Sequence, residues 1–362
     1  MMKELRLMKG NEAIAEAAIR AGADGYFGYP ITPQSEIMEY LMAEKPQDRT
    51  GMIVLQAESE IAAINMVYGG ASCGKRVMTS SSSPGFSLKQ EGISYLAGSE
   101  LPCLIVNVSR GGPGLGTIQP AQADYFQSTK GGGHGDYRML VLAPSSVQEM
   151  SDFVTLGFDL AFKYRNPVLM LSDGAIGQMM EKVELNEQKP RFTDEEIKKN
   201  TPWATTGKTP DRERNIITSL DLDSYKMEQH NVELQKKYRL MEENEVRYEE
   251  VNCDDADYIF IAYGTSARIC LKSIQLARAK GIKVGLLRPI TLFPFPKKPI
   301  AAIASKIKGI LVVELSAGQM VEDVRLAVEG CVKIEHYGRM GGIIHTPGEV
   351  VSALEKLIIG GK

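Results

Sequence analysis

Short, continuously apolar runs alternate with helical patterns over the first half of the chain. The spacing predicts helices over residues 11–21, 34–44, 59–72, 86–98, 120–129 and 145–164. The apolar runs between them are GYFGYP (25–30), MIVLQ (52–56), RVMTS (76–80), CLIVNVS (103–109), MLVLAP (139–144) and PVLMLS (167–172). Strands that are apolar at every position are typical of parallel sheets covered by helices on both faces. The pattern therefore predicts a doubly wound parallel α/β domain over residues 1–185.

The pattern changes twice after residue 185. Residues 186–250 are rich in charge and predict a linker followed by an exposed helix, for which we favour a solvated role over a partner-binding face. From residue 251 the alternation resumes, and residues 251–362 predict a second, smaller α/β domain. Its expected strands are 258–264, 282–288, 309–315 and 332–338, its helices lie near 265–280, 318–330 and 347–359, and 288–296 is a proline-broken loop.

Composition and charge exclude several classes of function. The net charge of −3 gives no electrostatic argument for nucleic acid or an anionic membrane. No apolar run is long enough to span a bilayer, and none follows a basic start, so we expect a cytoplasmic protein. The five cysteines are scattered without a C-x-x-C pair, so we expect no metal or iron–sulfur site formed by this chain alone.

Polar residues follow several of the predicted strands, at the sheet edge where parallel α/β folds bind ligands. In GYPITPQSEI (28–37), Thr32 lies between Pro30 and Pro33, which stiffen the loop. The hydroxyl of Thr32 is then either held towards a ligand or used to cap the next helix. The spacing alone does not choose between these interpretations.

The stretch AESEIAAINMVYGG (57–70) predicts a helix that is apolar almost all the way round and yet begins with acids. Glu58 fits a first-turn acid that faces solvent and complements the helix dipole. Glu60 leads the apolar residues that wrap the helix, so we expect its carboxyl group to be partly desolvated. A carboxyl group in this position is suited to sharing a proton with a ligand nitrogen.

Two further segments offer ligand-binding groups. TSSSSPGFS (79–87) supplies the hydroxyls of Ser81, Ser82 and Ser83, and Gly85 allows a close backbone approach; the alternative is a cluster of helix-capping serines. Arg110 follows the next strand and is suited to pairing with a substrate carboxylate, with a glycine-rich loop over 109–117 behind it. His134, in KGGGHGDYR, is better interpreted as a surface histidine than as a catalytic one.

The motifs GYPITP, ESEIAAINMVYGGA, TSSSSPGFSL, SRGGPGLGT and LSDGAIGQ, in this order, resemble the α subunit of the 2-oxoacid:ferredoxin oxidoreductases. The resemblance extends from about residue 5 to the C-terminus. The opening LMKGNEAIAEAAIRAGADGYFGYPITPQ is most similar to the ketoisovalerate type, which acts on branched-chain 2-oxo acids such as 3-methyl-2-oxobutanoate. The resemblance implies a thiamine-diphosphate pyrimidine-binding domain over 1–185, a linker and helix over 186–250, and a transketolase C-terminal-like domain over 251–362.

The resemblance also implies roles for individual residues. Glu60 would hydrogen-bond N1′ of the aminopyrimidine and favour its imino tautomer, Thr32 would hydrogen-bond the substrate, and Arg110 would contact the substrate carboxylate. The cofactor pocket would be lined by Glu60, Pro30, Ser81, Ser82, Ser83 and Gly85. The segment TSSSSPG has serines where many relatives read T-x-T-S-G-P-G, which leaves the detailed contacts of Ser82 and Ser83 open.

An absence in the sequence agrees with this resemblance. The Asp-Gly of LSDGAIGQ lacks the preceding glycine and following asparagine that bind magnesium diphosphate. In the family these groups lie on a β subunit, and the iron–sulfur clusters lie on further subunits (γ or δ); coenzyme A accepts the acyl group and ferredoxin the electrons. The implied function is a catalytic subunit that is active only with its partners. The alternatives are a complex for 2-oxoglutarate or an aryl pyruvate, and a non-catalytic subunit that serves assembly.

Overall fold

A computed structural model describes residues 4–208, 210 and 212–360. Its larger sheet is seven-stranded, in the order β12-β6-β7-β5-β4-β2-β3, and every neighbouring pair is parallel except β12 with β6. The strands are β2 (Gly25–Gly28), β3 (Ile53–Gln56), β4 (Val77–Ser81), β5 (Cys103–Ser109), β6 (Leu140–Leu142), β7 (Pro167–Asp173) and β12 (Thr291–Phe293). This confirms the predicted parallel α/β architecture.

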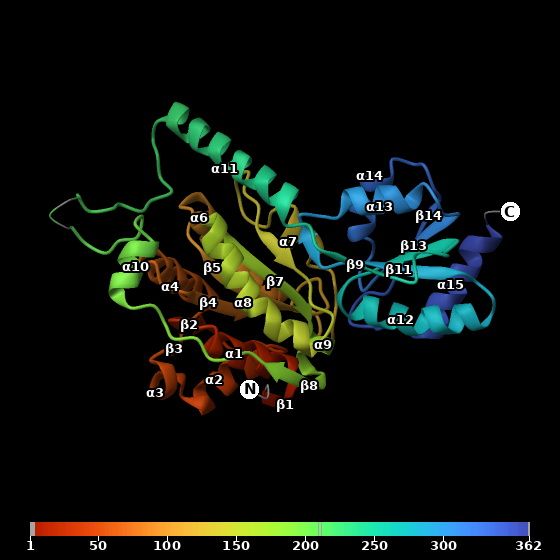
Figure 1. Ribbon diagram of the computed structural model, residues 1–362, viewed down its shortest axis with the longest axis horizontal. Coiled ribbons are helices and arrows are strands. Elements are labelled where there is room, and N and C mark those ends of the chain that lie inside the picture. The colour runs from red at the N-terminus through yellow and green to blue at the C-terminus, as the bar shows by residue number, and fades with distance from the viewer. Residues whose placement is uncertain (1–3, 209, 211, 361–362) are drawn as a thin grey trace.

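Helices cover both faces of this sheet (Figure 1). On one face, α1 (Gly10–Arg20) packs against α8 (Val147–Tyr164), which lies on β5 and β7. On the other face, α4 (Glu60–Ser72) packs on β2 and β4 and against α6 (Gln90–Gly98). The predicted helix over 86–98 is divided, because α5 (Ser83–Leu88) ends immediately before Lys89 and α6 begins after it.

The remaining elements of this half lie at its margins. The predicted helix over 120–129 is restricted to the single turn of α7 (Tyr125–Thr129). The two-stranded antiparallel sheet of β1 and β8 was not predicted, because its strands lie far apart in the sequence and meet only in the folded chain. The elements not yet named are β1 (Glu4–Lys9), β8 (Met180–Leu185), α2 (Ser35–Glu44), α3 (Pro46–Thr50), α9 (Gly174–Gln178) and α10 (Asp194–Asn200).

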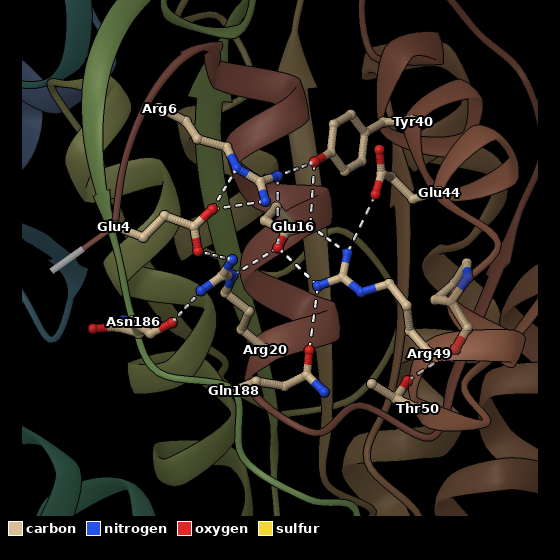
Figure 2. A network of polar contacts seen from close by, with 11 residues as sticks. Glu4, Arg6, Glu16, Arg20, Tyr40, Glu44, Arg49, Thr50, Asn186 and Gln188 are labelled. Atoms are coloured by element: carbon tan, nitrogen blue, oxygen red, sulfur yellow. Dashed lines mark hydrogen bonds and ion pairs between the residues drawn. The ribbon is translucent and has the colours of Figure 1, made fainter. Parts of the chain in front are cut away.

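Hydrogen bonds to one buried carboxylate join several of these marginal elements (Figure 2). Glu16 of α1 has no exposed surface and accepts hydrogen bonds from Arg20 (2.6 Å), Arg49 (3.0 Å from each Nη atom) and the Tyr40 hydroxyl (3.1 Å). Burial raises the pKa of the Glu16 carboxyl, but the hydrogen bonds from Arg49 and Arg20 outweigh this effect and hold the pKa below its ordinary value. The network joins α1 to α2 and α3, and Arg49 continues it to Gln188.

The predicted exposed helix is α11 (Ser224–Asn244), which crosses the surface of the first half (Figure 1). It is solvated on one side only. Leu234, Tyr238 and Met241 are buried in the core of the larger sheet's domain, and His230 hydrogen-bonds the carbonyl of Gly98 at 2.7 Å. Most of the helix is exposed, as expected, but these three residues attach it to the core.

The C-terminal part forms a five-stranded sheet in the order β14-β13-β10-β11-β9, in which only β9 is antiparallel to its neighbour. The segment predicted as a proline-broken loop, 288–296, instead ends β11 and supplies β12, which extends the larger sheet. The elements are β9 (Tyr248–Val251), β10 (Tyr258–Ile261), α12 (Gly264–Ala279), β11 (Val284–Pro289), α13 (Lys297–Ala304), β13 (Gly309–Glu314), α14 (Met320–Val328), β14 (Ile334–Gly338) and α15 (Pro347–Ile359).

Buried polar contacts join the two sheets' domains at the carboxyl edge of the larger sheet. Asp173 caps α9 and accepts a 2.8 Å hydrogen bond from the Thr265 hydroxyl. Gln122 donates to the Tyr263 carbonyl at 2.8 Å and accepts from Ser266 at 2.7 Å. The Asp-Gly of LSDGAIGQ thus serves the contact between domains.

In the part of the chain that the structure describes, no helix is long and apolar enough to cross a bilayer.

Candidate active site

The carboxyl ends of four adjacent strands meet at one edge of the larger sheet. From β2 the chain passes to the edge strand β3 and then crosses back over β2 to β4, so the direction of winding reverses beside β2. In open α/β sheets such a switch point opens a crevice in which ligands bind. Thr32 follows β2, Glu60 follows β3, Ser81 ends β4, and Arg110 follows β5.

Glu60 is buried at the start of α4, with 7% of its surface exposed. Ser59, not Glu60, caps the helix by accepting a hydrogen bond from Ala62 at 3.2 Å. Glu58 is exposed, as predicted for a solvent-facing first-turn acid. Among the described residues, no hydrogen bond or ion pair reaches the Glu60 carboxylate, so a nearly buried charge is left to be satisfied by something else.

Gly85 lies against the Glu60 carboxylate. A methyl group placed on Gly85 would lie 2.4 Å from Glu60 Oε1 and 2.3 Å from Ser81 Oγ, both far inside contact distance. Glycine is therefore required here by close approach. It also follows that Glu60 and Ser81 converge on the same point, although they come from different strands.

Two of the three serines carry hydroxyls without a partner. The Oγ atoms of Ser81 and Ser82 are fully buried and form no hydrogen bond among the described residues. Neither side chain caps α5, although Ser82 occupies its N-cap position. The alternative of a serine capping cluster therefore fails for this pair. Orphaned buried hydroxyls, one of which lies beside an unpartnered carboxylate, are what a polar ligand would satisfy.

Arg110 and Ser83 form a second group on the other side of these serines. The Arg110 guanidinium donates to the carbonyl oxygens of Thr32 (2.8 Å) and Leu115 (3.0 Å), which ties the 109–117 loop to the GYPITP loop. Ser83 Oγ accepts from the Arg110 amide (3.0 Å) and donates to Asp124 (2.7 Å). Arg110 keeps a buried Nε without a partner, so its guanidinium retains donor capacity for a further acceptor.

Thr32 and Pro30 are exposed on the loop after β2. Helix α2 begins after Gln34 without a side-chain cap, so the alternative that Thr32 caps this helix is wrong. The Thr32 hydroxyl is thus available at the carboxyl edge of the sheet. His134 is exposed and lies edge-on to Tyr95, as predicted for a surface histidine.

A cleft of about 430 Å³ opens beside Arg110 and Ser83, between the sheet edge and the second domain. Its lining includes the apolar side chains of Ala121, Leu315 and Met340. Of the described residues that line it, Arg110 is the one cation. Glu60 is not among the residues that line this cleft.

Sequence patterns missed two residues of this site. Asp124 holds Ser83 and the Asn107 amide (2.8 Å), and burial raises the pKa of its carboxyl. Lys89 is fully buried beneath Glu60, with its Nζ 3.3 Å from the Glu60 carbonyl oxygen. Lys89 falls inside the helix predicted over 86–98 and Asp124 inside the helix predicted over 120–129, and neither pattern gives a sign that the charged side chain is buried.

Comparison with known proteins identifies the fold and the family. Residues 16–250 match the model described as pyruvate flavodoxin/ferredoxin oxidoreductase, thiamine diphosphate-binding, and residues 256–350 match pyruvate:ferredoxin oxidoreductase core domain II. The ketoisovalerate oxidoreductase subunit VorB of Methanothermobacter thermautotrophicus is 52% identical, over 97% of either chain. The 2-oxoglutarate synthase subunit KorA of Methanocaldococcus jannaschii is 34% identical, over 99% of this chain and 100% of that protein.

Solved structures agree with the sequence relatives. The 2-oxoglutarate:ferredoxin oxidoreductase of Magnetococcus marinus superposes with a TM-score of 0.86 at 28% identity, over 98% of this chain and 66% of that one. A split-gene transketolase superposes with a TM-score of 0.61 at 13% identity, which shows a shared fold alone. This chain belongs to the pyruvate flavodoxin/ferredoxin oxidoreductase family and carries its thiamine diphosphate-binding domain.

Proposed function

We propose that this chain is the pyrimidine-binding catalytic subunit of a 2-oxo acid:ferredoxin oxidoreductase, with Glu60 as the residue that shares a proton with ring nitrogen N1′. The reaction converts a 2-oxo acid, coenzyme A and oxidised ferredoxin to acyl-CoA, carbon dioxide and reduced ferredoxin. The observation that carries the proposal is the buried Glu60 carboxylate, which has no partner among the described residues and lies beside the orphaned hydroxyl of Ser81. These groups fit the polar edge of an aminopyrimidine.

The residues of the chain have distinct tasks in this proposal. Glu60 holds a proton between its carboxylate and the ring nitrogen, and Gly85 leaves room for the carboxylate to stay in place. Ser81 and Ser82 offer hydroxyls to the ring. When bound, thiamine diphosphate supplies the electron sink for decarboxylation. Arg110 orients the substrate carboxylate, and Thr32 hydrogen-bonds the substrate from the loop after β2.

The cleft beside Arg110 favours a 2-oxo acid with one carboxylate and an apolar side chain. One guanidinium pairs with one carboxylate, and Ala121, Leu315 and Met340 offer apolar surface. We therefore propose 3-methyl-2-oxobutanoate and similar branched-chain acids as substrates. The similarity to KorA keeps 2-oxoglutarate as the second candidate, but its distal carboxylate would need another cation, which the described lining of the cleft does not supply.

A partner chain would complete the site on the outer face of α4. This helix carries no charge after Glu60, and yet Ile61 is 50% and Met66 37% exposed. The sequence shows a helix that is apolar almost all the way round, and the structure leaves part of this apolar surface exposed. Ile53 and Leu55 of the edge strand β3 and Leu88 are exposed as well, at 50%, 41% and 51%. We call these five residues the α4 face.

Helix α4 begins at Glu60, so a chain bound to the α4 face would lie next to the proposed cofactor site. Exposed apolar surface of this kind is typical of an interface between subunits. We propose that its occupant is the β subunit that holds magnesium and the diphosphate, while iron–sulfur clusters lie on further subunits. The assembly would work in the cytoplasm, and the domain boundaries at residues 185 and 250 remain part of the proposal.

Changing Glu60→Gln in the reconstituted complex tests the central assignment. Glutamine keeps the shape but cannot exchange the proton, so turnover should fall by about 10²–10⁴-fold while the chain still folds and assembles. Turnover of 3-methyl-2-oxobutanoate, 2-oxoglutarate and an aryl pyruvate by the wild-type complex tests the substrate. Near-normal turnover of the Glu60→Gln complex would refute the assignment and favour an assembly subunit.

A further inference from the structure

Lys89 is a lysine with no exposed surface, placed between α5 and α6. Its ammonium group donates hydrogen bonds to the Glu60 carbonyl oxygen (3.3 Å) and to the Thr79 hydroxyl (3.1 Å). No carboxylate forms an ion pair with it in the described chain. Burying an ammonium group without a paired anion costs stability, so a lysine kept at this position requires an explanation.

Few charges surround Lys89. The Glu60 carboxylate is the one charged group of the described chain that acts on it appreciably. Of the acids nearest in sequence to the pair, Glu58 is exposed, and Glu91 is exposed and accepts a hydrogen bond from the Tyr95 hydroxyl. Burial lowers the pKa of Lys89 to about 8, and Glu60 acts in the opposite direction. The ammonium form therefore still predominates at pH 7.

The charged groups on the far side of the serine segment are engaged elsewhere. Arg110 donates to the carbonyls of Thr32 and Leu115, and Asp124 accepts from Ser83 and Asn107. Thr79, which comes from β4, carries no charge. Lys89 is thus a buried cation placed against the first turn of α4, where its ammonium group contacts the Glu60 carbonyl oxygen.

We propose that Lys89 is a positioning residue for Glu60: it anchors the first turn of α4 and adds one buried positive charge to the site in which Glu60 and the ligand's ring nitrogen share a proton. This inference rests on the proposed function of Glu60. A cation in a poorly solvated site favours the charged form of a neighbouring carboxylate. The hydrogen bond to the Glu60 carbonyl fixes the backbone from which that carboxylate extends.

The proposal predicts how acidification acts on the site. In the working arrangement, Glu60 and the ring nitrogen share one proton, and acidification adds a second proton to this pair. Without the Lys89 charge, the pair takes up the second proton at a higher pH. The acid limb of the pH profile therefore moves upward when the charge is removed.

The test compares Lys89→Gln, Lys89→Arg and Thr79→Val in the reconstituted complex. Lys89→Gln keeps hydrogen-bond donors but removes the charge, and it should move the acid limb of kcat upward by about one pH unit or more, the usual effect of one nearby charge. Near-ultraviolet circular dichroism of bound thiamine diphosphate, which reports the protonation state of its pyrimidine ring, should move with it. Lys89→Arg keeps the charge and Thr79→Val removes only an acceptor, so both should retain the wild-type limb.

Thermal unfolding of each isolated chain shows whether a variant changes the pH profile because it fails to fold or because it lacks the Lys89 charge. If Lys89→Gln does not fold, Lys89→Met removes the charge without burying a new polar group and carries the same expectation. A wild-type acid limb and dichroism in a folded, charge-free variant would overturn the role of Lys89. If Glu60→Gln alone abolishes turnover in that case, the proposed function survives; if Glu60→Gln is also active, both proposals fail.

Discussion

Replacing Gly85 with alanine tests whether the position of the Glu60 carboxylate matters for catalysis. The new methyl group would lie 2.4 Å from Glu60 Oε1, whereas ordinary contact begins near 3.4 Å, so the carboxylate must retreat by about 1 Å. Ser81 Oγ, at 2.3 Å from the same point, must move as well. Because a misplacement of about 1 Å can cost about 10²-fold in rate, we expect kcat to fall by about that factor.

The assay is steady-state turnover of the reconstituted complex, together with titration of thiamine diphosphate by isothermal calorimetry. Gly348→Ala in α15 is the matched control, because a methyl group there meets no atom within 4 Å and the glycine is exposed. It should leave both measurements unchanged. A Gly85→Ala complex with wild-type kcat and cofactor affinity would show that the close approach of Gly85 to Glu60 has no part in catalysis.

Two further predictions concern stability and assembly. Changing Glu16→Gln leaves Arg20 and Arg49 without the buried carboxylate that they share and should cost about 3 kcal/mol in the free energy of unfolding by denaturant. Glu213→Gln, in an exposed ion pair, should cost nothing measurable. Since the folded pKa of Glu16 lies below 4.5, its contribution is complete above that pH and is lost as the pH falls further, so wild type and variant should converge in acid. Met66→Glu on the α4 face should abolish capture of the β subunit in gel filtration while the chain stays folded. The control, Leu326→Glu on the exposed surface of α14, should assemble normally. A Met66→Glu chain that still assembles would place the interface elsewhere.

Much of the fold could be predicted because its main signals are local. Continuously apolar strands and the helices between them follow from the sequence period. The structure confirms the strands from β2 to β7 and the helices between them, except that the helix over 86–98 is divided and that over 120–129 is a single turn. The pairing of residues 4–9 with residues 180–185, and of 291–293 with β6, could not be predicted in this way. Those strands are short and form through contacts between distant parts of the chain, which no local pattern records.

The residues of the candidate site show the same difference between local signals and long-range contacts. Position at the end of a strand was enough to single out Glu60, Thr32 and Arg110, because parallel strands bring their carboxyl ends to one edge. Burial was not predictable: Lys89 has a charged side chain and yet lies fully inside. The converse holds for Met66, an apolar residue that remains exposed. The burial of Lys89 and the exposure of Met66 both depend on which side chains pack against their helices. In our account, part of that packing comes from a partner chain.

A structure of the assembled complex with thiamine diphosphate bound tests the account most directly. The distance to measure joins the nearer Glu60 carboxylate oxygen to N1′ of the pyrimidine. We predict a charge-assisted hydrogen bond of about 2.7 Å, with the second chain seated over α4. A pyrimidine ring bound elsewhere, or a Glu60 side chain turned away from it into solvent, would contradict the account.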